Sequence, residues 1–232
     1  MIDVVRALAP DIRAEADRIE RERRLPLALV RGLARAGVFR LCVPRALGGE
    51  EADAATLIAV LEELAHADGS TGWCAMIGAT SGLVSAYLPD AEARAIYGTS
   101  PDVVTGGVFA PTGSAVRENA HYRVNGRWRF ASGCQHCDWL MAGCLVQDDG
   151  PPRARMVLFP ATDAEIIDTW TVSGLRGTGS HDFEVKDVFS QQQVAGGRNG
   201  DEFSDPFDDS QHKRQEVIGQ GSSIQQNSIA DL

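Results

Sequence analysis

Apolar side chains recur every three to four residues through the first hundred positions, the spacing of amphipathic helices. The first such stretch covers residues 3–23, and its apolar positions are Val4, Val5, Leu8, Ile12, Ala16 and Ile19. Pro26 suits the first turn of a second, shorter helix, and Gly37 suits its C-terminal cap. Asp53 is placed to cap a third helix. The pattern therefore predicts an all-helical domain over residues 1–100.

One predicted helix, from residue 71 to about residue 87, has no charged side chain. We expect a helix without charge to be buried. Trp73, Ile77 and Ser81 are spaced four residues apart and share one face, which mixes an aromatic ring with a hydroxyl. Such a face is typical of core packing and also of the wall of a ligand cavity. Both interpretations stay open.

After residue 100 the apolar positions change to a period of two, which predicts strands. The candidate strands are 103–109, 120–131, 138–147, 153–159, 165–172 and 183–189. They predict a second domain over residues 101–190, a compact antiparallel sheet or β-barrel-like domain, so the fold class is α+β. Beyond it, apolar residues are scarce and have no period, and we predict a disordered polar tail over residues 191–232.

A hairpin is predicted at Asn125-Gly126, because these two residues tolerate the positive φ angles of a type I′ turn. The predicted buried face of this hairpin is Tyr122, Val124, Trp128 and Phe130. Its second strand ends in the small residues 131–133, where a flat ligand could approach the backbone and receive a hydrogen bond from Ser132. An ordinary hairpin ending in a glycine turn explains the same residues.

Composition narrows the classes of function. The formal net charge is −10 over 232 residues and no cluster of lysine and arginine interrupts it, which argues against a nucleic-acid partner. No run approaches the roughly 18 apolar residues that cross a bilayer, and the N-terminus lacks a signal pattern. The cysteine count of five is odd and does not indicate a disulfide framework. We expect a cytoplasmic protein with reduced thiols and no membrane contact.

The segment Cys134-Gln-His-Cys137 is the strongest candidate for metal or redox chemistry. It has no second pair of ligands, and it follows a predicted strand instead of opening a helix, so buried thiols explain it better and we predict no metal site. His136 and His181 are candidate acid–base groups, although a lone histidine in a loop is more often a solvated or hydrogen-bonded surface residue.

Four segments in the same order resemble the acyl-CoA dehydrogenase superfamily, and the resemblance runs from about residue 5 to residue 189. They are residues 37–49, 109–114, 125–133 and 173–180, the last followed by Val-Lys-Asp-Val-Phe at 185–189. The run Phe-Ala-Ser-Gly at 130–133 resembles the flavin-dependent monooxygenase branch, the oxygenase components of two-component aromatic hydroxylases, more than the dehydrogenases.

The resemblance implies reduced FMN or FAD as cofactor, a separate flavin reductase as partner, and an aromatic or polycyclic small-molecule substrate. The implied cofactor-binding residues are Val108, Phe109, Gly113, Ser114, Phe130, Ala131 and Ser132. The four from the 108–114 segment would form a loop against the flavin, Phe130 would pack on its ring system, and Ser132 would hydrogen-bond near its reactive N5 as the catalytic contact. Trp73 and Ser81 are the implied wall of the substrate cavity.

One departure from the resemblance bears on activity. Members of the superfamily continue into a C-terminal helical bundle that completes the flavin site and makes tetramer contacts, whereas this chain turns polar after Phe189. Our hypothesis is a truncated or frame-shifted member that leaves apolar surface exposed on its helical half. Two alternatives stay open, an acyl-CoA dehydrogenase-like FAD enzyme and a non-catalytic fragment.

Overall fold

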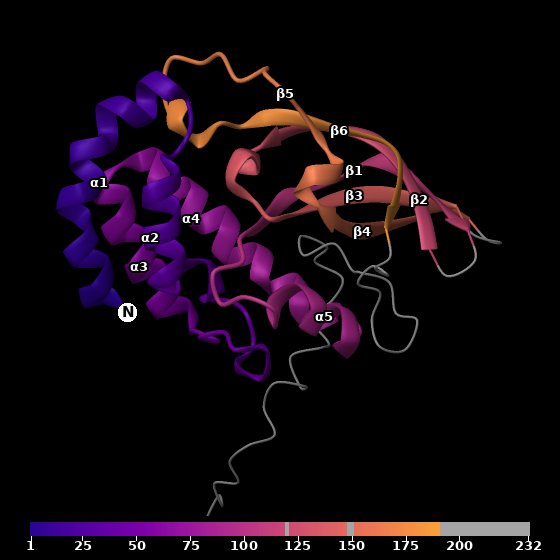
Figure 1. Ribbon diagram of the computed structural model, residues 1–232, viewed down its shortest axis with the longest axis horizontal. Coiled ribbons are helices and arrows are strands. Elements are labelled where there is room, and N and C mark those ends of the chain that lie inside the picture. The colour runs from indigo at the N-terminus through magenta and orange to yellow at the C-terminus, as the bar shows by residue number, and fades with distance from the viewer. Residues whose placement is uncertain (119–120, 148–150, 191–232) are drawn as a thin grey trace, which may run out of the picture.

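The computed structural model describes residues 1–118, 121–147 and 151–190. In this part of the chain, helices make up the N-terminal half and strands the C-terminal half (Figure 1). The helices are α1 (Ile2–Glu22), α2 (Leu27–Arg35), α3 (Ala54–Ala67), α4 (Gly69–Ser81) and α5 (Asp90–Tyr97). The strands are β1 (Thr105–Glu118), β2 (His121–Ala131), β3 (Trp139–Gln147), β4 (Arg153–Pro160), β5 (Glu165–Ile167) and β6 (His181–Ser190).

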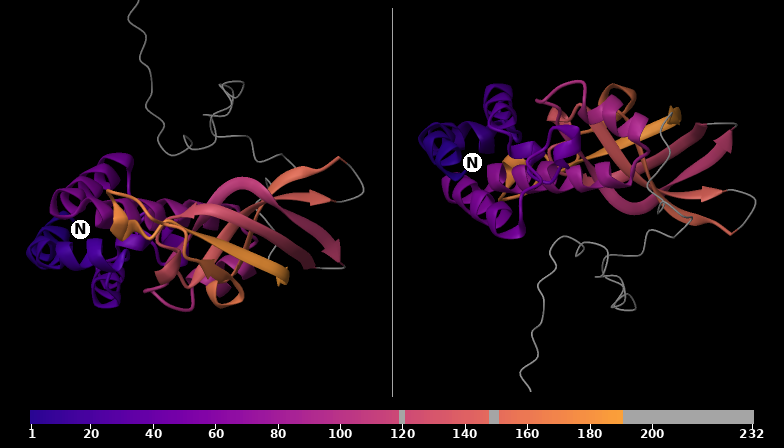
Figure 2. Two further views of the ribbon diagram at one scale, coloured as in Figure 1. Left: turned by 90° about the horizontal axis from the view of Figure 1, so that it is seen from above. Right: turned by 90° about the horizontal axis from the view of Figure 1, so that it is seen from below.

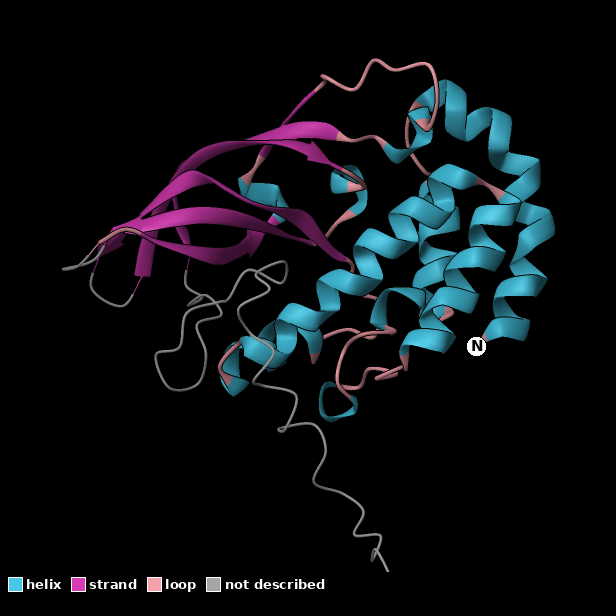
Figure 3. Cartoon of the chain, turned by 180° about the vertical axis from the view of Figure 1, so that it is seen from behind, coloured by secondary structure: helices cyan, strands magenta, loops and turns pink. Residues whose placement is uncertain are grey.

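The change from helix to strand falls between Tyr97 and Thr105, where the sequence predicts a boundary. Most of the helices lie at one end of the molecule and the strands at the other (Figure 3), whereas α5 packs against β3 and β4. The division into two domains stays a prediction. The predicted tail over residues 191–232 lies outside the described residues.

The strands form one six-stranded sheet in the order β4-β3-β1-β2-β6-β5, and they twist away from the helices at one end (Figure 2). Most neighbours are antiparallel, but β1 and β3 run parallel, so the predicted antiparallel sheet is corrected to a mixed one. The reason is topological. β2 lies on one side of β1, and after β2 the chain returns through a short 3₁₀ turn, Cys134–His136, to start β3 on the other side of β1.

The predicted turn at Asn125-Gly126 is wrong, because both residues lie inside the continuous strand β2. Strands β1 and β2 pair from Ser114 opposite Asn125 to Glu118 opposite His121, so their connection falls at residues 119–120. Asn125-Gly126 instead mark a shift of register against β6. The Asn125 amide holds this bulge, since its Oδ1 accepts from the Asp187 backbone N–H at 2.9 Å.

The predicted buried face of β2 holds only in part. Val124 and Trp128 are fully buried, and the Trp128 ring stacks on Phe183 with centroids 5.1 Å apart. Phe130, by contrast, has a φ of 61° and is 70% exposed, so the expectation that it faces the core is wrong. The left-handed backbone at this residue breaks the two-residue alternation and turns the ring outward.

Helix α4 lies between the other helices and the sheet (Figure 1). Its N-terminal cap is Asp68, whose carboxylate accepts from the Thr71 N–H at 2.6 Å, and residues 82–87 continue it as a 3₁₀ helix. A Cβ on Gly72 would lie 2.7 Å from Ala65, and one on Gly78 would lie 2.4 Å from the Phe39 ring. The helix is therefore packed at contact distance against two other elements.

The helical half also leaves apolar side chains exposed. Leu27 of α2, Ile58 of α3 and Leu83 after α4 are each more than half exposed. No helix in the described residues is long and apolar enough to cross a membrane.

We predict opposite effects of alanine at two helical glycines. Gly72→Ala pushes a methyl group into the backbone of α3 and should lower the free energy of unfolding by about 1–3 kcal/mol. At Gly32 in α2 an added Cβ meets nothing within 4 Å, so Gly32→Ala should raise the free energy of unfolding by about 0.5–1 kcal/mol. Urea unfolding of both variants measures the difference, and equal effects of the two substitutions would contradict this packing.

Candidate functional site

Ser132 and Trp73, which the sequence assigns to the cofactor and to the cavity wall, are brought into direct contact. Ser132 follows the end of β2, is 5% exposed, and donates its backbone N–H to the Phe130 carbonyl at 2.9 Å. The Trp73 indole, which projects from α4, donates its Nε1–H to Ser132 Oγ at 2.9 Å. Trp73 is 45% exposed, so the expectation that α4 is buried throughout is wrong on this face.

Two further hydroxyls continue from Ser132 into the interior. Ser132 Oγ lies 2.7 Å from Ser180 Oγ, which lies 2.7 Å from Thr178 Oγ1. The Thr178 hydroxyl donates to the Leu175 carbonyl at 2.9 Å. Ser180 and Thr178 are both less than 5% exposed. We refer to Ser132, Ser180 and Thr178 as the hydroxyl chain.

Apolar side chains surround the outer end of the hydroxyl chain. The Phe130 ring meets the edge of Trp170 at a centroid distance of 6.2 Å, and Trp170 Nε1 donates to the Leu175 carbonyl at 3.1 Å. The Leu175 side chain packs on Gly69, one turn of α4 before Trp73. We refer to the apolar side chains that these contacts link to Ser132 as the apolar rim, which consists of Trp73, Phe130, Trp170 and Leu175.

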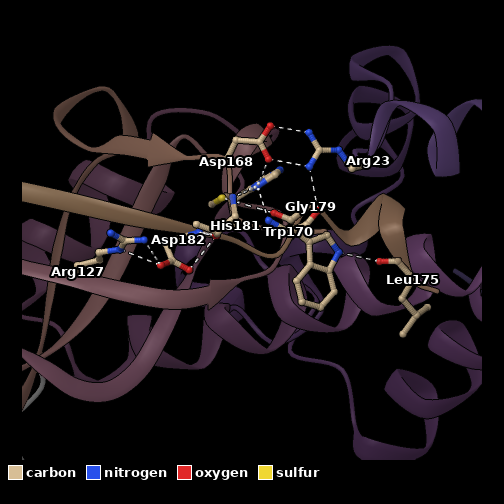
Figure 4. A network of polar contacts seen from close by, with 10 residues as sticks. Arg23, Arg127, Asp168, Trp170, Leu175, Gly179, His181 and Asp182 are labelled. Atoms are coloured by element: carbon tan, nitrogen blue, oxygen red, sulfur yellow. Dashed lines mark hydrogen bonds and ion pairs between the residues drawn. The ribbon is translucent and has the colours of Figure 1, made fainter. Parts of the chain in front are cut away.

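The rim depends on the loop between β5 and β6, which a polar network anchors (Figure 4). Arg23, the residue that ends α1, pairs with both carboxylate oxygens of Asp168 at 2.7 and 2.6 Å. Its Nη1 also donates to the Trp170 carbonyl at 2.9 Å. The loop is thereby tied to the helical half. Sequence reasoning missed Trp170, because its partner Phe130 is 40 residues away in the chain.

His181 holds the same loop from the side of the sheet (Figure 4). Its Nδ1 accepts from the backbone N–H groups of Thr169 and Trp170, both at 3.2 Å, which places the imidazole proton on Nε2. The residue is 2% exposed, and burial lowers its pKa although Asp168 acts in the opposite direction. The expectation of a surface histidine is therefore wrong.

Gly177 lets the loop approach the helices. A Cβ there would lie 2.0 Å from Ile19 of α1 and 3.0 Å from Ser70 of α4. Leu175 adopts a left-handed φ of 52°, which is uncommon for a residue with a side chain. The glycine-rich segment therefore serves close packing, and it places the Leu175 carbonyl at the inner end of the hydroxyl chain.

The four residues expected to form a loop in the 108–114 segment lie within strand β1. The register against β3 shifts between Val108 and Gly113, so the intervening residues bulge from the ladder and Phe109 is 50% exposed. A Cβ on Gly113 would lie 2.1 Å from the Trp128 ring, which makes this glycine a packing residue. Ser114 is exposed and donates to the Asn125 carbonyl at 3.4 Å. The structure therefore replaces the expected loop with a bulged strand.

Ser81 does not join Trp73 and Ser132. Its hydroxyl donates to the Ile77 carbonyl within α4 at 2.7 Å, and it lies about 12 Å along the helix from Trp73 at 1.5 Å per residue. A cavity of about 410 Å³ lies between α2 and the segments 99–104 and 136–139, and neither Trp73 nor Ser81 lines it. The contacts place Ser81 in the packing of α4.

Comparison with known proteins identifies relatives of this chain. Residues 1–91 match the family model of the acyl-CoA dehydrogenase N-terminal domain. The oxygenase subunit HsaA of a flavin-dependent monooxygenase from Mycobacterium tuberculosis is 37% identical over 183 residues, which cover 78% of this chain and 46% of the relative. This chain belongs to the acyl-CoA dehydrogenase superfamily.

Two further proteins similar to this chain are informative. The indole-3-acetate monooxygenase of Pseudomonas putida is 36% identical over 80% of this chain and 49% of its own length. The structure of XiaF from a Streptomyces species in complex with FADH2 and glycerol superposes with a TM-score of 0.75 at 34% identity, over 82% of this chain and 48% of XiaF. The chain thus spans about half the length of the curated relatives it matches.

The predicted burial of the thiols is confirmed for Cys134 and Cys144, whereas Cys137, like Cys42, is only half-buried. Cys74, Cys134 and Cys144 are at most 2% exposed, and burial raises the pKa of Cys134 to about 12. Among the described residues, no cluster of three or more potential metal ligands occurs. His136 is half-buried beside Phe39, and burial lowers its pKa to about 4.

The lowered pKa of His136 predicts a loss of stability in mild acid. Above pH 6.5 the histidine is neutral in both states, whereas between pH 6.5 and about 4 the unfolded chain takes up a proton that the folded protein excludes. The free energy of unfolding should fall by up to ~1.4 kcal/mol per pH unit from this group. His136→Gln should make the free energy of unfolding less dependent on pH between pH 7 and 5, as measured by urea unfolding. The pH dependence that remains should include the smaller contribution of His181.

The exposed histidine of α3 provides the matched control. His66→Gln removes a histidine whose side chain is 74% exposed. The loss of stability in mild acid should persist in that variant. If the free energy of unfolding depends on pH equally in His136→Gln and in the unsubstituted protein, that result contradicts the burial of His136.

Proposed function

We propose that this chain forms a reduced-flavin site of the type used by the oxygenase components of two-component monooxygenases, which hydroxylate an aromatic small molecule with O2. The observation that carries the proposal is the buried hydroxyl of Ser132, which is in direct contact with the partly exposed Trp73 indole of the apolar rim. A flat ring system with few polar atoms at its reactive edge fits such a surface. HsaA and the indole-3-acetate monooxygenase of the same superfamily support the reaction class.

The residues present fit a flavin ring by their chemistry. Phe130 and Trp73 offer exposed aromatic surface, and Trp170 supports Phe130 through an edge contact. When bound, a reduced flavin supplies the electrons that activate O2. The rim would contact only the ring system, which FMN and FAD share, so the proposal covers both cofactors.

The roles of this chain's own residues follow from their positions. Phe130 and Trp73 would hold the ring plane and exclude water from it. Ser132 would hold a hydrogen bond at the ring edge next to N5. A separate flavin reductase is the proposed source of reduced cofactor, consistent with the name oxygenase subunit carried by HsaA.

Removal of the Phe130 ring should weaken flavin binding. Phe130→Ala should raise the Kd for reduced FMN at least tenfold, because stacking of one aromatic side chain on a flat base contributes about 1–3 kcal/mol. Anaerobic absorbance and fluorescence titrations measure this change. Phe189→Ala is the matched control, since Phe189 is 55% exposed on β6 outside the rim. The site is refuted when both variants bind reduced FMN as tightly as the unsubstituted chain.

Removal of the Ser132 hydroxyl should speed the release of hydrogen peroxide by the protein loaded with reduced FMN. In a single turnover of the reduced FMN complex with O2, Ser132→Ala should release hydrogen peroxide about tenfold faster, the effect of about 1.4 kcal/mol on a barrier. Stopped-flow detection of peroxide measures the rate. Ser85→Ala removes another buried hydroxyl, which donates to Gly82, and should leave the rate unchanged. An unaltered rate in Ser132→Ala would exclude Ser132 from the mechanism.

A further inference from the structure

The hydroxyl chain has only one arrangement of protons that satisfies all its hydrogen bonds. A carbonyl oxygen only accepts, so the single proton of the Thr178 hydroxyl lies in the bond to Leu175. Thr178 Oγ1 must then accept from Ser180, and the single proton of the Ser180 hydroxyl lies in that bond. Ser180 Oγ must accept from Ser132 in turn. Each hydroxyl therefore donates inward, from Ser132 toward Leu175.

This direction determines what Ser132 can offer at the rim. Its hydroxyl proton points to Ser180, and its backbone N–H is held by the Phe130 carbonyl. One lone pair of Ser132 Oγ receives the Trp73 indole N–H. A hydroxyl oxygen has two lone pairs, so the remaining hydrogen-bonding capacity of this hydroxyl is a single acceptor position.

Reduced and oxidised flavins differ at the atom concerned, since reduced flavin carries a hydrogen on N5 and oxidised flavin carries a lone pair there. We propose that Ser180 and Thr178 are positioning residues that hold the Ser132 hydroxyl as an acceptor, so that the site selects the reduced cofactor over the oxidised one. This inference rests on the proposed function. It adds the residues that set the preference for the reduced form.

The size of the preference for reduced flavin follows from the free-energy cost of turning the Ser132 proton outward. Ser132 can donate to an oxidised flavin in two ways: it rotates alone and loses its bond to Ser180, or all three hydroxyls rotate outward and the bond from Thr178 Oγ1 to the Leu175 carbonyl is lost. That carbonyl keeps two other donors, the Trp170 indole at 3.1 Å and the Thr178 backbone N–H at 3.2 Å. Either way thus costs one buried hydrogen bond, which corresponds to roughly a tenfold ratio of dissociation constants.

The test compares the affinities of the 232-residue chain for oxidised FMN and for dithionite-reduced FMN under anaerobic conditions. The ratio of the oxidised to the reduced Kd should fall about tenfold in Ser180→Ala, where the Ser132 proton becomes free to turn outward. Thr178→Val should give a similar fall, because Ser180 loses its acceptor. The midpoint potential of bound FMN should fall by ~30 mV in both variants, the two-electron equivalent of a tenfold ratio.

Two controls separate positioning from folding. Thr178→Ser keeps the hydroxyl and should restore the ratio and the potential of the unsubstituted chain. Ser85→Ala removes a buried hydroxyl that is not part of the hydroxyl chain, and the ratio of the oxidised to the reduced Kd should stay unchanged. Circular dichroism establishes that each variant is folded before titration.

The outcomes distinguish this inference from the function on which it rests. An unchanged ratio in both Ser180→Ala and Thr178→Val, with FMN still bound, overturns the inference and leaves the flavin site standing. A fall in Thr178→Val that Thr178→Ser does not reverse also overturns it. No binding of either form of FMN by the unsubstituted chain removes the proposed function and the inference together.

Discussion

The close packing of α4 is the constraint on which the fold and the candidate site both depend. The helix has no side chain at Gly72, where α3 approaches, and none at Gly78, where the Phe39 ring lies. Such contacts leave little freedom to slide or rotate, because protein interiors are close-packed. Trp73 projects from this fixed helix toward the end of β2. The 2.9 Å bond between its indole and Ser132 is therefore a consequence of how deeply α4 is seated.

The loop between β5 and β6 supplies Trp170 and Leu175 of the rim and the inner part of the hydroxyl chain, and its conformation has an energetic cost. Leu175 adopts a left-handed backbone, which a residue with a side chain keeps only when its surroundings enforce it. The enforcing contacts come from both halves of the molecule, Arg23 with Asp168 on the helical side and His181 on the sheet side. They hold a carbonyl that orients three hydroxyls. The polar network thus acts at a distance on the hydrogen-bonding character of Ser132.

Local patterns in the sequence determined the elements and several of their ends. The three-to-four-residue period predicted the helices, and the Asp53 cap is confirmed by its 2.7 Å bond with the Thr56 N–H. The two-residue period located most strand ends closely, with the greatest error at the end of β1, which runs to Glu118 where the pattern predicted an end at residue 109. The resemblance drew attention to Trp73 and Ser132 separately. These successes share one cause, since periodicity, caps and short motifs depend on residues near one another in the chain.

Only the tertiary structure decided how those elements meet. Asn125-Gly126 is as compatible with a bulge as with a turn, and pairing with β6 selected the bulge. Phe130 lies outside the core because its backbone is left-handed at the strand end. His181 is buried through contacts with Thr169 and Trp170 of the loop between β5 and β6. The hydroxyl chain joins the end of β2 to the segment before β6, and Trp73 connects it to α4. These contacts span 48 and 59 residues of sequence, and no local pattern encodes the geometry of such long-range contacts.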